Sequence, residues 1–365
     1  MKIHGQHVRG IHFDKDAAQL TLLDQTLLPF RVEWIKLSSL ADACHAISTM
    51  QVRGAPAIGA VAAYGMVLAV REGNVSLNEA ASRLKATRPT AVNLAWAVER
   101  MVDRLQGIDG IERYKNACDE AAAIVEEDVS NCSAIGDHGL GLIESIWERK
   151  GKSTVNILTH CNAGWLATVD WGTALAPMYK AQQKGIDVHV WVDETRPRNQ
   201  GALLSCLELK EQGIPHTLIV DNAGGLLMQE GKVDLCIVGS DRTTANGDVC
   251  NKIGTYLKAL AAFDNQVPFY VALPVSTIDW KLASGKDIPI EYRSEDEVLT
   301  VMGGNSHNQV EKLNVTVPGV RALNPAFDVT PARYVTGLIT EHGIFPASVD
   351  GLSKLKALLD NNNKG

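Results

Sequence analysis

The sequence predicts an α/β protein with two domains. Its 365 residues suggest about two domains, because a domain averages roughly 150 residues. From Ser39 to about Arg149, apolar residues recur every three or four positions, as they do on amphipathic helices. After Lys150, short β-branched runs alternate with Ala- and Leu-rich helical runs, which indicates a parallel sheet. We therefore expect a boundary near Gly151, between domains over 1–150 and 151–365.

The first segment is predicted to form a short antiparallel strand pair. Apolar residues alternate from Gln19 to Leu23, and Leu28-Pro29-Phe30 has the composition of a turn. A second strand is expected from Arg31 to Leu37. From Ser39 the pattern becomes helical, with Gly and Pro separating the stretches. The smaller N-terminal domain should therefore combine a short antiparallel sheet with a helical bundle.

Five short apolar runs in the second domain are predicted strands. Helices are expected between them, beginning near Thr173, Gly201 and Asn251. Continuous apolar strands alternating with helices are typical of a parallel sheet covered on both faces. The predicted strands are Val155 to Thr159, Val188 to Val192, Thr217 to Val220, Leu235 to Val238 and Phe269 to Leu273.

Composition and charge exclude several classes of protein. The 35 basic and 42 acidic residues give a net charge of −7, which offers no footprint for nucleic acid or an anionic membrane. No run of roughly 18 uninterrupted apolar residues and no signal-like N-terminus is present, so we expect a cytoplasmic protein. The seven scattered cysteines form no CxxC pair, which favours reduced thiols over disulfides or zinc.

Four successive predicted strands end in polar segments that contain glycine. In open parallel sheets, ligands bind at the carboxyl ends of the strands, so these segments predict a cleft. The sequence lacks G-x-G-x-x-G, G-x-S-x-G and H-E-x-x-H, and Gly151-Lys152-Ser153 lacks the first glycine of a Walker loop, so nucleotide hydrolysis is disfavoured. The segments are 160–164 (HCNAG), 193–201 (DETRPRNQG), 221–225 (DNAGG) and 239–242 (GSDR).

Cys161 and Asp241 are the candidate reactive groups. Cys161 follows a strand beside backbone N–H groups that could lower its pKa; the alternative is a buried structural cysteine. Asp241 precedes Arg242, so it is either an ion-pair partner or, in an apolar cleft, a general acid. His160 could assist ionisation of the thiol or be structural. Both interpretations stay open for each residue.

Candidate anion-binding residues lie at two expected helix starts. Asn251-Lys252 should begin one helix, and Arg53-Gly54-Ala55 precedes an Ala-rich one, where free N–H groups favour phosphate. The alternatives are a solvated lysine and a surface salt bridge; Arg88 is a weaker candidate. Gln200, in a loop rich in donors, could bind sugar hydroxyls. In that loop Asp193, Glu194, Arg196 and Arg198 are expected to pair with one another rather than hold a metal.

Taken together, these motifs resemble the methylthioribose-1-phosphate isomerase family. More loosely they resemble regulatory subunits of translation initiation factor 2B and archaeal ribose-1,5-bisphosphate isomerases. The resemblance runs in order from about residue 10 to residue 345. Besides the four strand-end segments, it rests on 53–59 (RGAPAIG), 246–248 (NGD), 251–255 (NKIGT) and 324–331 (NPAFDVTP).

The resemblance implies a homodimeric, cofactor-free aldose–ketose isomerase of methionine salvage, with a Rossmann-like C-terminal domain. Such an enzyme converts S-methyl-5-thio-α-D-ribose 1-phosphate to S-methyl-5-thio-D-ribulose 1-phosphate, so the expected partner is a small phosphosugar. By the resemblance, Cys161 and Asp241 carry the chemistry, and no metal is implied. The implied substrate-binding residues are Arg53, Gly54, Ala55, Arg88, Gln200, Asn251 and Lys252.

Three departures from the family pattern leave alternatives open. Trp165 replaces a small residue, Val169-Asp170-Trp171 replaces a stretch of small residues and Tyr, and Ser240 makes GSDR of the usual GADR. Bulk beside the thiol bears on the substituent at carbon 5, so a 5-deoxyribose-1-phosphate isomerase is an alternative. Trp165 and Trp171 would form an apolar cap there, against a bisphosphate. A non-catalytic sensing subunit would not need both Cys161 and Asp241.

Overall fold

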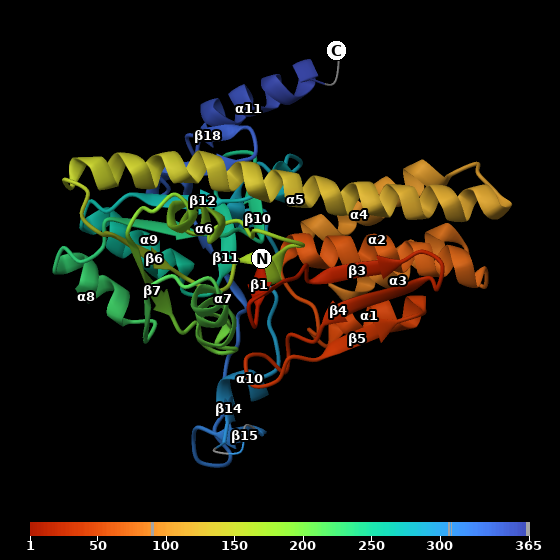
Figure 1. Cartoon of the computed structure of the whole chain (residues 1–365), viewed down its shortest axis with the longest axis horizontal. Helices are drawn as coiled ribbons and strands as arrows, with labels where there is room; N and C mark the ends of the chain where they lie inside the picture. The colour runs from red at the N-terminus through yellow and green to blue at the C-terminus, as the bar shows by residue number, and fades with distance from the viewer. Residues whose placement is uncertain (89–90, 306, 308, 363–365) are drawn as a thin grey trace.

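The computed structural model describes residues 1–88, 91–305, 307 and 309–362. A helical part and a part built on a large sheet lie side by side, and the long helix α5 (Gly110–Arg149) runs along both (Figure 1). The N-terminal part contains β1 (Lys2–Ile3), β2 (Gln6–His7), β3 (Ile11–Asp14), β4 (Gln19–Leu23), β5 (Trp34–Leu37), α1 (Leu40–Ser48), α2 (Ala55–Glu72), α3 (Leu77–Thr87) and α4 (Val92–Leu105).

The predicted strand pair is confirmed and gains a third strand. β4 pairs antiparallel with β5, as expected, although β5 begins at Trp34 rather than Arg31. On its other edge β4 pairs with β3, which the sequence analysis missed. The short β3 carries only Ile11 and Phe13 as apolar residues, too few to mark a strand by alternation.

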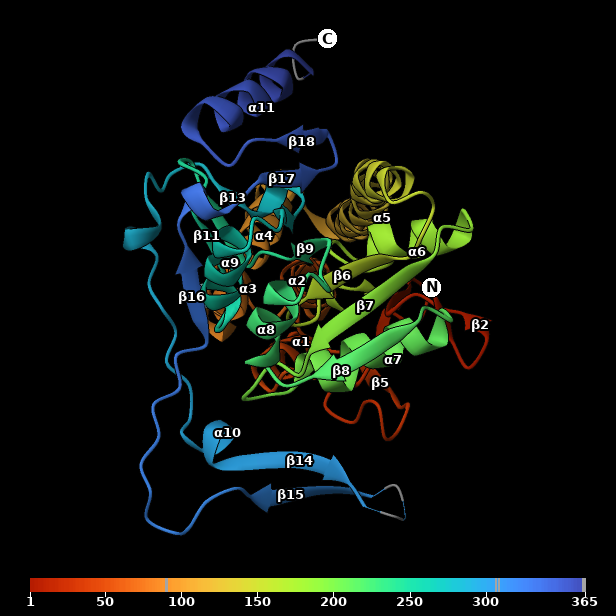
Figure 2. The same ribbon diagram turned by 90° about the vertical axis from the view of Figure 1, so that its left-hand side faces the viewer.

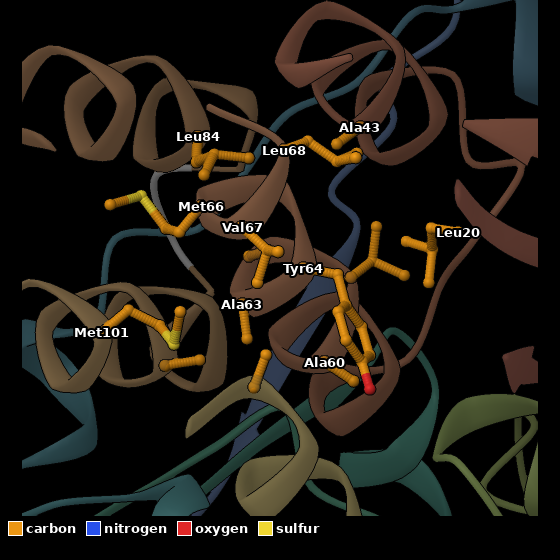
Figure 3. Close-up of a cluster of buried hydrophobic side chains, with 14 of the residues drawn as sticks. Leu20, Ala43, Ala60, Ala63, Tyr64, Met66, Val67, Leu68, Leu84 and Met101 are labelled. Atoms are coloured by element: carbon orange, nitrogen blue, oxygen red, sulfur yellow. The ribbon is translucent and has the colours of Figure 1, made fainter. Parts of the chain in front are cut away.

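Helix α2 forms the centre of the N-terminal core. It is rich in Ala and Gly, so neighbouring helices approach it closely, and side chains of α1, α3, α4 and β4 surround it (Figure 3). By length and composition α2 could also span a membrane, but 78% of it is buried within the protein. That burial is what a core helix requires. The labelled core side chains are Leu20, Ala43, Ala60, Ala63, Tyr64, Met66, Val67, Leu68, Leu84 and Met101.

The large sheet has the order β18-β17-β12-β9-β6-β7-β8, and all neighbours are parallel except β17 and β18. All five predicted strands are present, within one residue at each end. The strands are β6 (Val155–Thr159), β7 (Val188–Asp193), β8 (His216–Ile219), β9 (Leu235–Val238), β12 (Phe269–Ala272), β17 (Gly337–Thr340) and β18 (Gly343–Phe345).

Helices cover both faces of this sheet (Figure 2). Ile157 of β6 packs in the core shared with α5, α6 and α7, whereas its neighbour Leu158 packs with α8, α9 and α11. Successive strand residues point to opposite faces, so an unbroken apolar strand serves both cores. The helices are α6 (Ala176–Gln183), α7 (Cys206–Glu211), α8 (Ala223–Gln229), α9 (Thr255–Asp264) and α11 (Val349–Asn362); α7 follows the π-helix η2 (Gly201–Ser205).

The expected helix start at Asn251 is wrong. Asn251 and Lys252 end strand β11, which pairs antiparallel with β16, and helix α9 begins only at Thr255. The partner of Asn251 and Lys252 is β16, more than 70 residues later in the chain, so local sequence could not show that pairing; on its other edge β11 pairs with β10, which closely precedes it. This smaller sheet has the order β13-β10-β11-β16. Its strands are β10 (Arg242–Thr244), β11 (Val249–Lys252), β13 (Ile278–Asp279) and β16 (Phe327–Thr330).

A hairpin projects from the sheet-containing part (Figure 2). It consists of β14 (Thr300–Gly304) and β15 (Val310–Asn314), which follow helix α10 (Asp296–Leu299). Short 3₁₀ turns complete the described elements: η1 (Trp165–Ala167), η3 (Val275–Thr277), η4 (Gly285–Asp287) and η5 (Ala332–Tyr334).

Helix α5 contributes to both cores. Residues in its first half, such as Ala121 and Ile124, pack with α2 and α4, whereas Ile135 and Ile143 pack with α6 and the large sheet. The residues of α5 therefore pass from the helical core to the core of the large sheet within the helix, ahead of the expected boundary near Gly151.

Candidate active site

All nine predicted site residues line one cleft. It lies beyond the carboxyl ends of β6 and β9, beside the start of α2, and contains about 680 Å³ of space free of atoms, part of it open to solvent. The nine are Arg53, Gly54, Ala55, Arg88, Cys161, Gln200, Asp241, Asn251 and Lys252, and Met50, Asn162, Thr173, Arg293 and Phe327 are among the other lining residues. The rule that ligands bind at strand ends therefore located the cleft correctly.

Arg53 is held rigidly at the entry to α2. One guanidinium nitrogen donates to Asn162 Oδ1 at 2.9 Å and another to the Asn162 carbonyl at 2.7 Å. Gly54, the residue before the helix, has φ of 97°, and a Cβ there would lie 2.3 Å from the Ala167 carbonyl oxygen. Glycine is required because the backbones approach so closely. The helix start and a fixed cation thus face the cleft together.

Cys161 stands at the end of β6 in a left-handed conformation, with φ of 67°. Its N–H donates to Thr195 Oγ1 and its carbonyl accepts from Ser205 Oγ, both at 2.8 Å. Burial raises the pKa of the thiol, while the charges of Arg53 and Lys252 act to lower it. The backbone N–H of Asn162 also acts to lower this pKa, as expected, but desolvation of the thiolate outweighs it, so the net shift is upward.

Asp241 lines the same cleft as Cys161. The Asp241 N–H donates to the Cys250 carbonyl at 2.9 Å, which ties the residue to β11. Arg242, its sequence neighbour, forms an ion pair with Asp279 on β13, with 3.6 Å between Nη1 and Oδ2. Asp241 and Cys161 are close enough that the Asp241 charge raises the pKa of the thiol. The reactive candidates thus share one electrostatic environment.

Lys252 is a buried cation at the end of β11. Its Nζ donates to the Ala326 carbonyl at 2.9 Å and lies 4.7 Å from the centre of the Phe327 ring. Burial and the charge of Arg293 lower the pKa of Lys252 to about 8. Asn251, before it, donates to Thr255 Oγ1 at 3.1 Å. These residues therefore reach the cleft from a strand, and the predicted helix-start geometry does not apply to them.

Arg293 is a cleft residue that sequence reasoning missed. Its guanidinium lies 5.4 Å from the centre of the Phe327 ring, and its Nε donates to Glu291 at 2.7 Å. Arg88 lies 3.9 Å from the same glutamate, and its buried Nε has no hydrogen-bond partner among the described residues. Arg293 follows none of the predicted strands, so no local signal marked it. With Arg53 and Lys252, the cleft holds at least these four cations.

Gln200 is buried, and its Oε1 has no hydrogen-bond partner among the described residues. The surrounding loop is not the self-paired network that the sequence predicted. Arg198 pairs with Glu297 at 2.8 Å, and Arg196 donates to the Pro197 and Val298 carbonyls. These contacts join the loop to α10, a segment about 100 residues later in the chain. The unsatisfied Gln200 oxygen is thus free to accept from a ligand in the cleft.

Contacts with Glu208 on α7 explain why the HCNAG segment has asparagine at position 162 and glycine at position 164. Its carboxylate accepts from Asn162 Nδ2 at 2.7 Å, from the Trp165 N–H at 2.7 Å and from Tyr179 OH at 2.6 Å. A Cβ on Gly164 would lie 1.9 Å from Glu208 Oε2. Asn162 therefore links a buried carboxylate to Arg53. Nothing in the sequence near Glu208 indicated this role.

The two tryptophans do not form the expected cap. Among the described residues, neither Trp165 nor Trp171 lines the cleft. Trp165 is fully buried in the core between the sheet and α6. Lys180 Nζ lies 4.8 Å from the centre of the Trp171 ring. Trp165 lies in the turn η1 and belongs to the core, and Trp171 packs against that core, so the bulk of neither ring lies among the residues that line the cleft.

A second cavity, the adjoining chamber, lies beside the cleft and has both apolar and polar lining residues. The two share Met50, Arg53 and Gln200. The chamber contains about 1050 Å³ of space free of atoms, part of it open to solvent, and extends to the β14–β15 hairpin. Its apolar lining residues are Leu28, Phe30, Met50, Pro197, Leu203, Leu204 and Met302.

Comparisons with known proteins show the family to which this chain belongs. Residues 51–347 match the initiation factor 2 subunit family. The methylthioribose-1-phosphate isomerase of Gluconobacter oxydans is 58% identical to this chain, over 97% of this chain and 98% of its own length. That of Escherichia coli O45:K1 is 56% identical, over 98% of this chain and 97% of its own length.

The crystal structure of 5-methylthioribose 1-phosphate isomerase from Pyrococcus horikoshii superposes with a TM-score of 0.83, at 40% identity over 97% of both chains. A structure described as the delta subunit of translation initiation factor eIF-2B from A. fulgidus gives 0.77, at 39% identity over 95% of this chain and all of the other. The chain therefore belongs to the initiation factor 2 subunit family and, within it, to the methylthioribose-1-phosphate isomerases.

Proposed function

We propose that the chain is an aldose–ketose isomerase of methionine salvage. It would convert S-methyl-5-thio-α-D-ribose 1-phosphate to S-methyl-5-thio-D-ribulose 1-phosphate. The observation that carries the proposal is the single cleft in which a thiol, a carboxyl group and four cations meet, in a chain 58% identical to an enzyme of that name. A phosphosugar needs cations for its phosphate and acid–base groups for its sugar.

The substrate sets a specific chemical problem. An ordinary aldose opens its ring through the free hydroxyl on carbon 1, but here that oxygen carries the phosphate. The bond between carbon 1 and the ring oxygen must therefore break, and the departing oxygen must gain a proton. We assign this proton donation to Asp241, which lines the cleft and whose neighbour Arg242 is engaged by Asp279.

The positive character that develops at carbon 1 can be removed in two ways. Either the hydrogen on carbon 2 moves to carbon 1 as hydride, or a base takes it as a proton and a proton returns to carbon 1. Both leave a ketone at carbon 2. Cys161 is proposed as the base, or as the group that stabilises the cation. Burial of its thiol favours the neutral form, and the cations Arg53 and Lys252 favour the thiolate.

The cations of the cleft would hold the phosphate. Arg53 and Arg293 are fixed by hydrogen bonds, Lys252 is held by the Ala326 carbonyl, and Arg88 lies beside Glu291. Groups that are already ordered lose little entropy on binding, so orientation would supply much of the rate. The unsatisfied Gln200 oxygen would accept from a sugar hydroxyl.

The substituent on carbon 5 distinguishes the candidate substrates. The adjoining chamber beside Gln200 offers some apolar surface, from Leu203, Leu204 and Met302, which suits a methylthio group. A 5-deoxyribose 1-phosphate would leave more of this surface without contact. A bisphosphate would place charge in the chamber, where Arg198 and Lys312 are already paired with Glu297 and Asp296.

We also propose a homodimer of cytoplasmic chains that need no cofactor, with domains over 1–150 and 151–365 and a Rossmann-like second domain. Large apolar side chains exposed near β8 and on the packed helices α8 and α9 support a dimer contact. They are Leu218, Val220, Leu226, Leu257 and Phe263, each at least half exposed. Sedimentation of wild type and of Phe263→Glu tests it: the wild type should sediment as a dimer and the variant as a monomer.

Three incubations test the activity itself. Purified protein is mixed separately with methylthioribose 1-phosphate, 5-deoxyribose 1-phosphate and ribose 1,5-bisphosphate, and ketose 1-phosphate is followed by NMR. The highest kcat/KM is expected for the methylthio sugar. Preference for the deoxy sugar would replace the proposed substrate, and no turnover of any of the three would favour a non-catalytic sensing subunit. Deuterium at carbon 1 after reaction in D₂O would indicate proton transfer rather than hydride transfer.

A further inference from the structure

Glu208 is a buried side chain on α7 on which four hydrogen-bond donors converge. Its Oε1 accepts from Asn162 Nδ2 at 2.7 Å and from the Leu166 N–H at 3.3 Å. Its Oε2 accepts from the Trp165 N–H at 2.7 Å and from Tyr179 OH at 2.6 Å. Both oxygens are therefore engaged, and the carboxylate is held in one position.

The two neighbours of Asn162 allow its amide only one orientation. A guanidinium only donates, so the side-chain oxygen of Asn162 must face Arg53. The amide nitrogen, which also only donates, then faces the carboxylate of Glu208. Turning the amide over would place N–H groups against the guanidinium and an oxygen against the carboxylate. Glu208 and Arg53 therefore fix the same amide from opposite ends.

Ser205 connects this amide to the residue that carries the thiol. Asn162 Nδ2 also donates to Ser205 Oγ at 3.2 Å, and Ser205 Oγ donates to the Cys161 carbonyl at 2.8 Å. Ser205 ends the π-helix η2 and Glu208 lies three residues later on α7, a spacing that places two side chains on one face of a helix. The contacts of one helix face thus reach both Arg53 and the backbone of Cys161.

Glu208 also holds the turn against which the start of α2 packs. It bonds the first two N–H groups of η1, at Trp165 and Leu166. The third residue of that turn, Ala167, has its carbonyl oxygen 2.3 Å from where a Cβ on Gly54 would lie. Gly54 directly follows Arg53, so the same carboxylate supports the backbone beside this cation as well as its side chain.

Arg53 is the group in the cleft on which these contacts act. Its two bonds to Asn162 use two of its five N–H groups. Burial lowers the pKa of the Arg53 guanidinium, and the negative charges of Cys161 and Glu208 act to raise it. We propose that Glu208 is a positioning residue, which orients the Asn162 amide so that Arg53 is held where it binds the phosphate group of a ligand. Its effect on turnover rests on the proposed isomerase activity, but its effect on phosphate binding does not.

Calorimetric titration with inorganic phosphate tests the proposal without turnover. In Glu208→Gln one acceptor atom must serve four donors and the charge is lost, so the Kd for phosphate should rise roughly tenfold. Tyr179→Phe is the matched control, because it removes a hydrogen bond from the same carboxylate and none from Asn162. Its Kd should equal that of the wild type. An unchanged Kd in folded Glu208→Gln, or no measurable phosphate binding by the wild type, would overturn the proposal.

A second variant covers the case in which Glu208→Gln does not fold. Glu208→Asp keeps the charge but withdraws the carboxylate by one methylene from Asn162. The Kd for phosphate should rise in this variant too, again by roughly tenfold, because the bond at 2.7 Å is lost. Circular dichroism establishes which variants are folded. Wild-type affinity in folded Glu208→Asp would contradict the proposal.

A double-mutant cycle tests whether Glu208 acts through Asn162. In Asn162→Ala the link to Arg53 is already removed, so adding Glu208→Gln should not weaken phosphate binding further. A second loss of the same size in this background would show that Glu208 acts by another route, and would overturn the proposal.

Kinetics separate positioning from a general loss of folded protein. A displaced phosphate ligand should raise KM for methylthioribose 1-phosphate roughly tenfold in Glu208→Gln, with kcat little changed. Partial unfolding would instead lower the apparent kcat at constant KM, and that result would count against the proposal. If the wild type turns over no sugar while the phosphate titrations behave as expected, the isomerase proposal fails and the positioning role stands.

Discussion

Arg53 donates two hydrogen bonds to one residue, Asn162: 2.9 Å to the side-chain oxygen and 2.7 Å to the backbone carbonyl. Asn162 is held in turn by Glu208 on α7. The chain of contacts runs from a buried carboxylate through an amide to a guanidinium in the cleft. Arg53 lies two residues before the first residue of α2, and Asn162 follows β6, so these contacts also fix the helical part against the sheet.

Replacing Arg53 by lysine should reduce kcat/KM for the phosphosugar by roughly a hundredfold. An ammonium cannot make both hydrogen bonds to Asn162 and still present a planar donor face to a phosphate. The initial rate of ketose formation measures the loss. Arg83→Lys, which changes an exposed arginine paired with Glu79, is the matched control and should retain wild-type kinetics. Equal kcat/KM in both variants would contradict this role for Arg53.

Cys161→Ser and Asp241→Asn should each lower kcat by at least roughly a hundredfold, the usual scale of acid–base catalysis. Both substitutions nearly preserve side-chain size, so the variants should remain folded, as circular dichroism and thermal unfolding would show. The buried Cys236→Ser on β9 is a control for loss of a thiol outside the cleft and should retain kcat if it folds. Near-normal turnover in either cleft variant would remove that residue from the mechanism.

The pH dependence should show the titration of Lys252. Burial and Arg293 lower its pKa to about 8, so its positive charge is lost as pH rises through about 8. A phosphate then loses one of its cations, and kcat/KM should fall above this pH. Lys252→Arg keeps a positive charge throughout this range and should lack the fall at pH 8. The same inflection in wild type and Lys252→Arg would assign it to another group.

Gly164→Ala should destabilise the fold by roughly 3 kcal/mol or more, as overpacking against a fixed buried group does. The new Cβ would lie 1.9 Å from Glu208 Oε2, which the Trp165 N–H and Tyr179 OH hold in place. Urea unfolding measures the change. Gly141→Ala, on an exposed position of α5 with nothing within 4 Å, should instead stabilise by about 0.5–1 kcal/mol.

Asp128→Asn should stabilise the protein at pH 8 by about 1–3 kcal/mol. Burial raises the pKa of Asp128 to about 7, above its ordinary value of 3.8. Between these two pKa values the folded state holds a proton on Asp128 that the unfolded state has lost. The free energy of unfolding therefore declines as pH rises from about 4 to 7. Asparagine can still accept from the Val169 N–H, which bonds Oδ2 at 2.9 Å. Urea unfolding should show the gain at pH 8 and almost none near pH 4, whereas the exposed Asp119→Asn should show little difference at either pH.

Local sequence identified the large sheet and the strand ends that bear Cys161 and Asp241. An apolar run such as Leu235–Val238 predicts a strand by itself, because a strand buried on both faces must be apolar throughout. The parallel arrangement then brings the ends of β6 and β9 to one edge, and the polar segments follow the strands there. For the same reason the start of α2 could be read from Arg53-Gly54-Ala55-Pro56 alone.

Tertiary structure decided the parts that depend on residues distant in the chain. Lys252 lies on a strand only because β16 pairs with it, and Arg293 enters the cleft beside Phe327 from a segment with no local pattern. Glu208 acts on Asn162 across 46 positions, and Arg198 pairs with Glu297 across 99. The sequence could likewise not decide whether the pKa of Cys161 is raised or lowered, since desolvation depends on what packs around the thiol. Chain order shows which residues carry reactive groups, but burial and partners arise only when distant segments pack together.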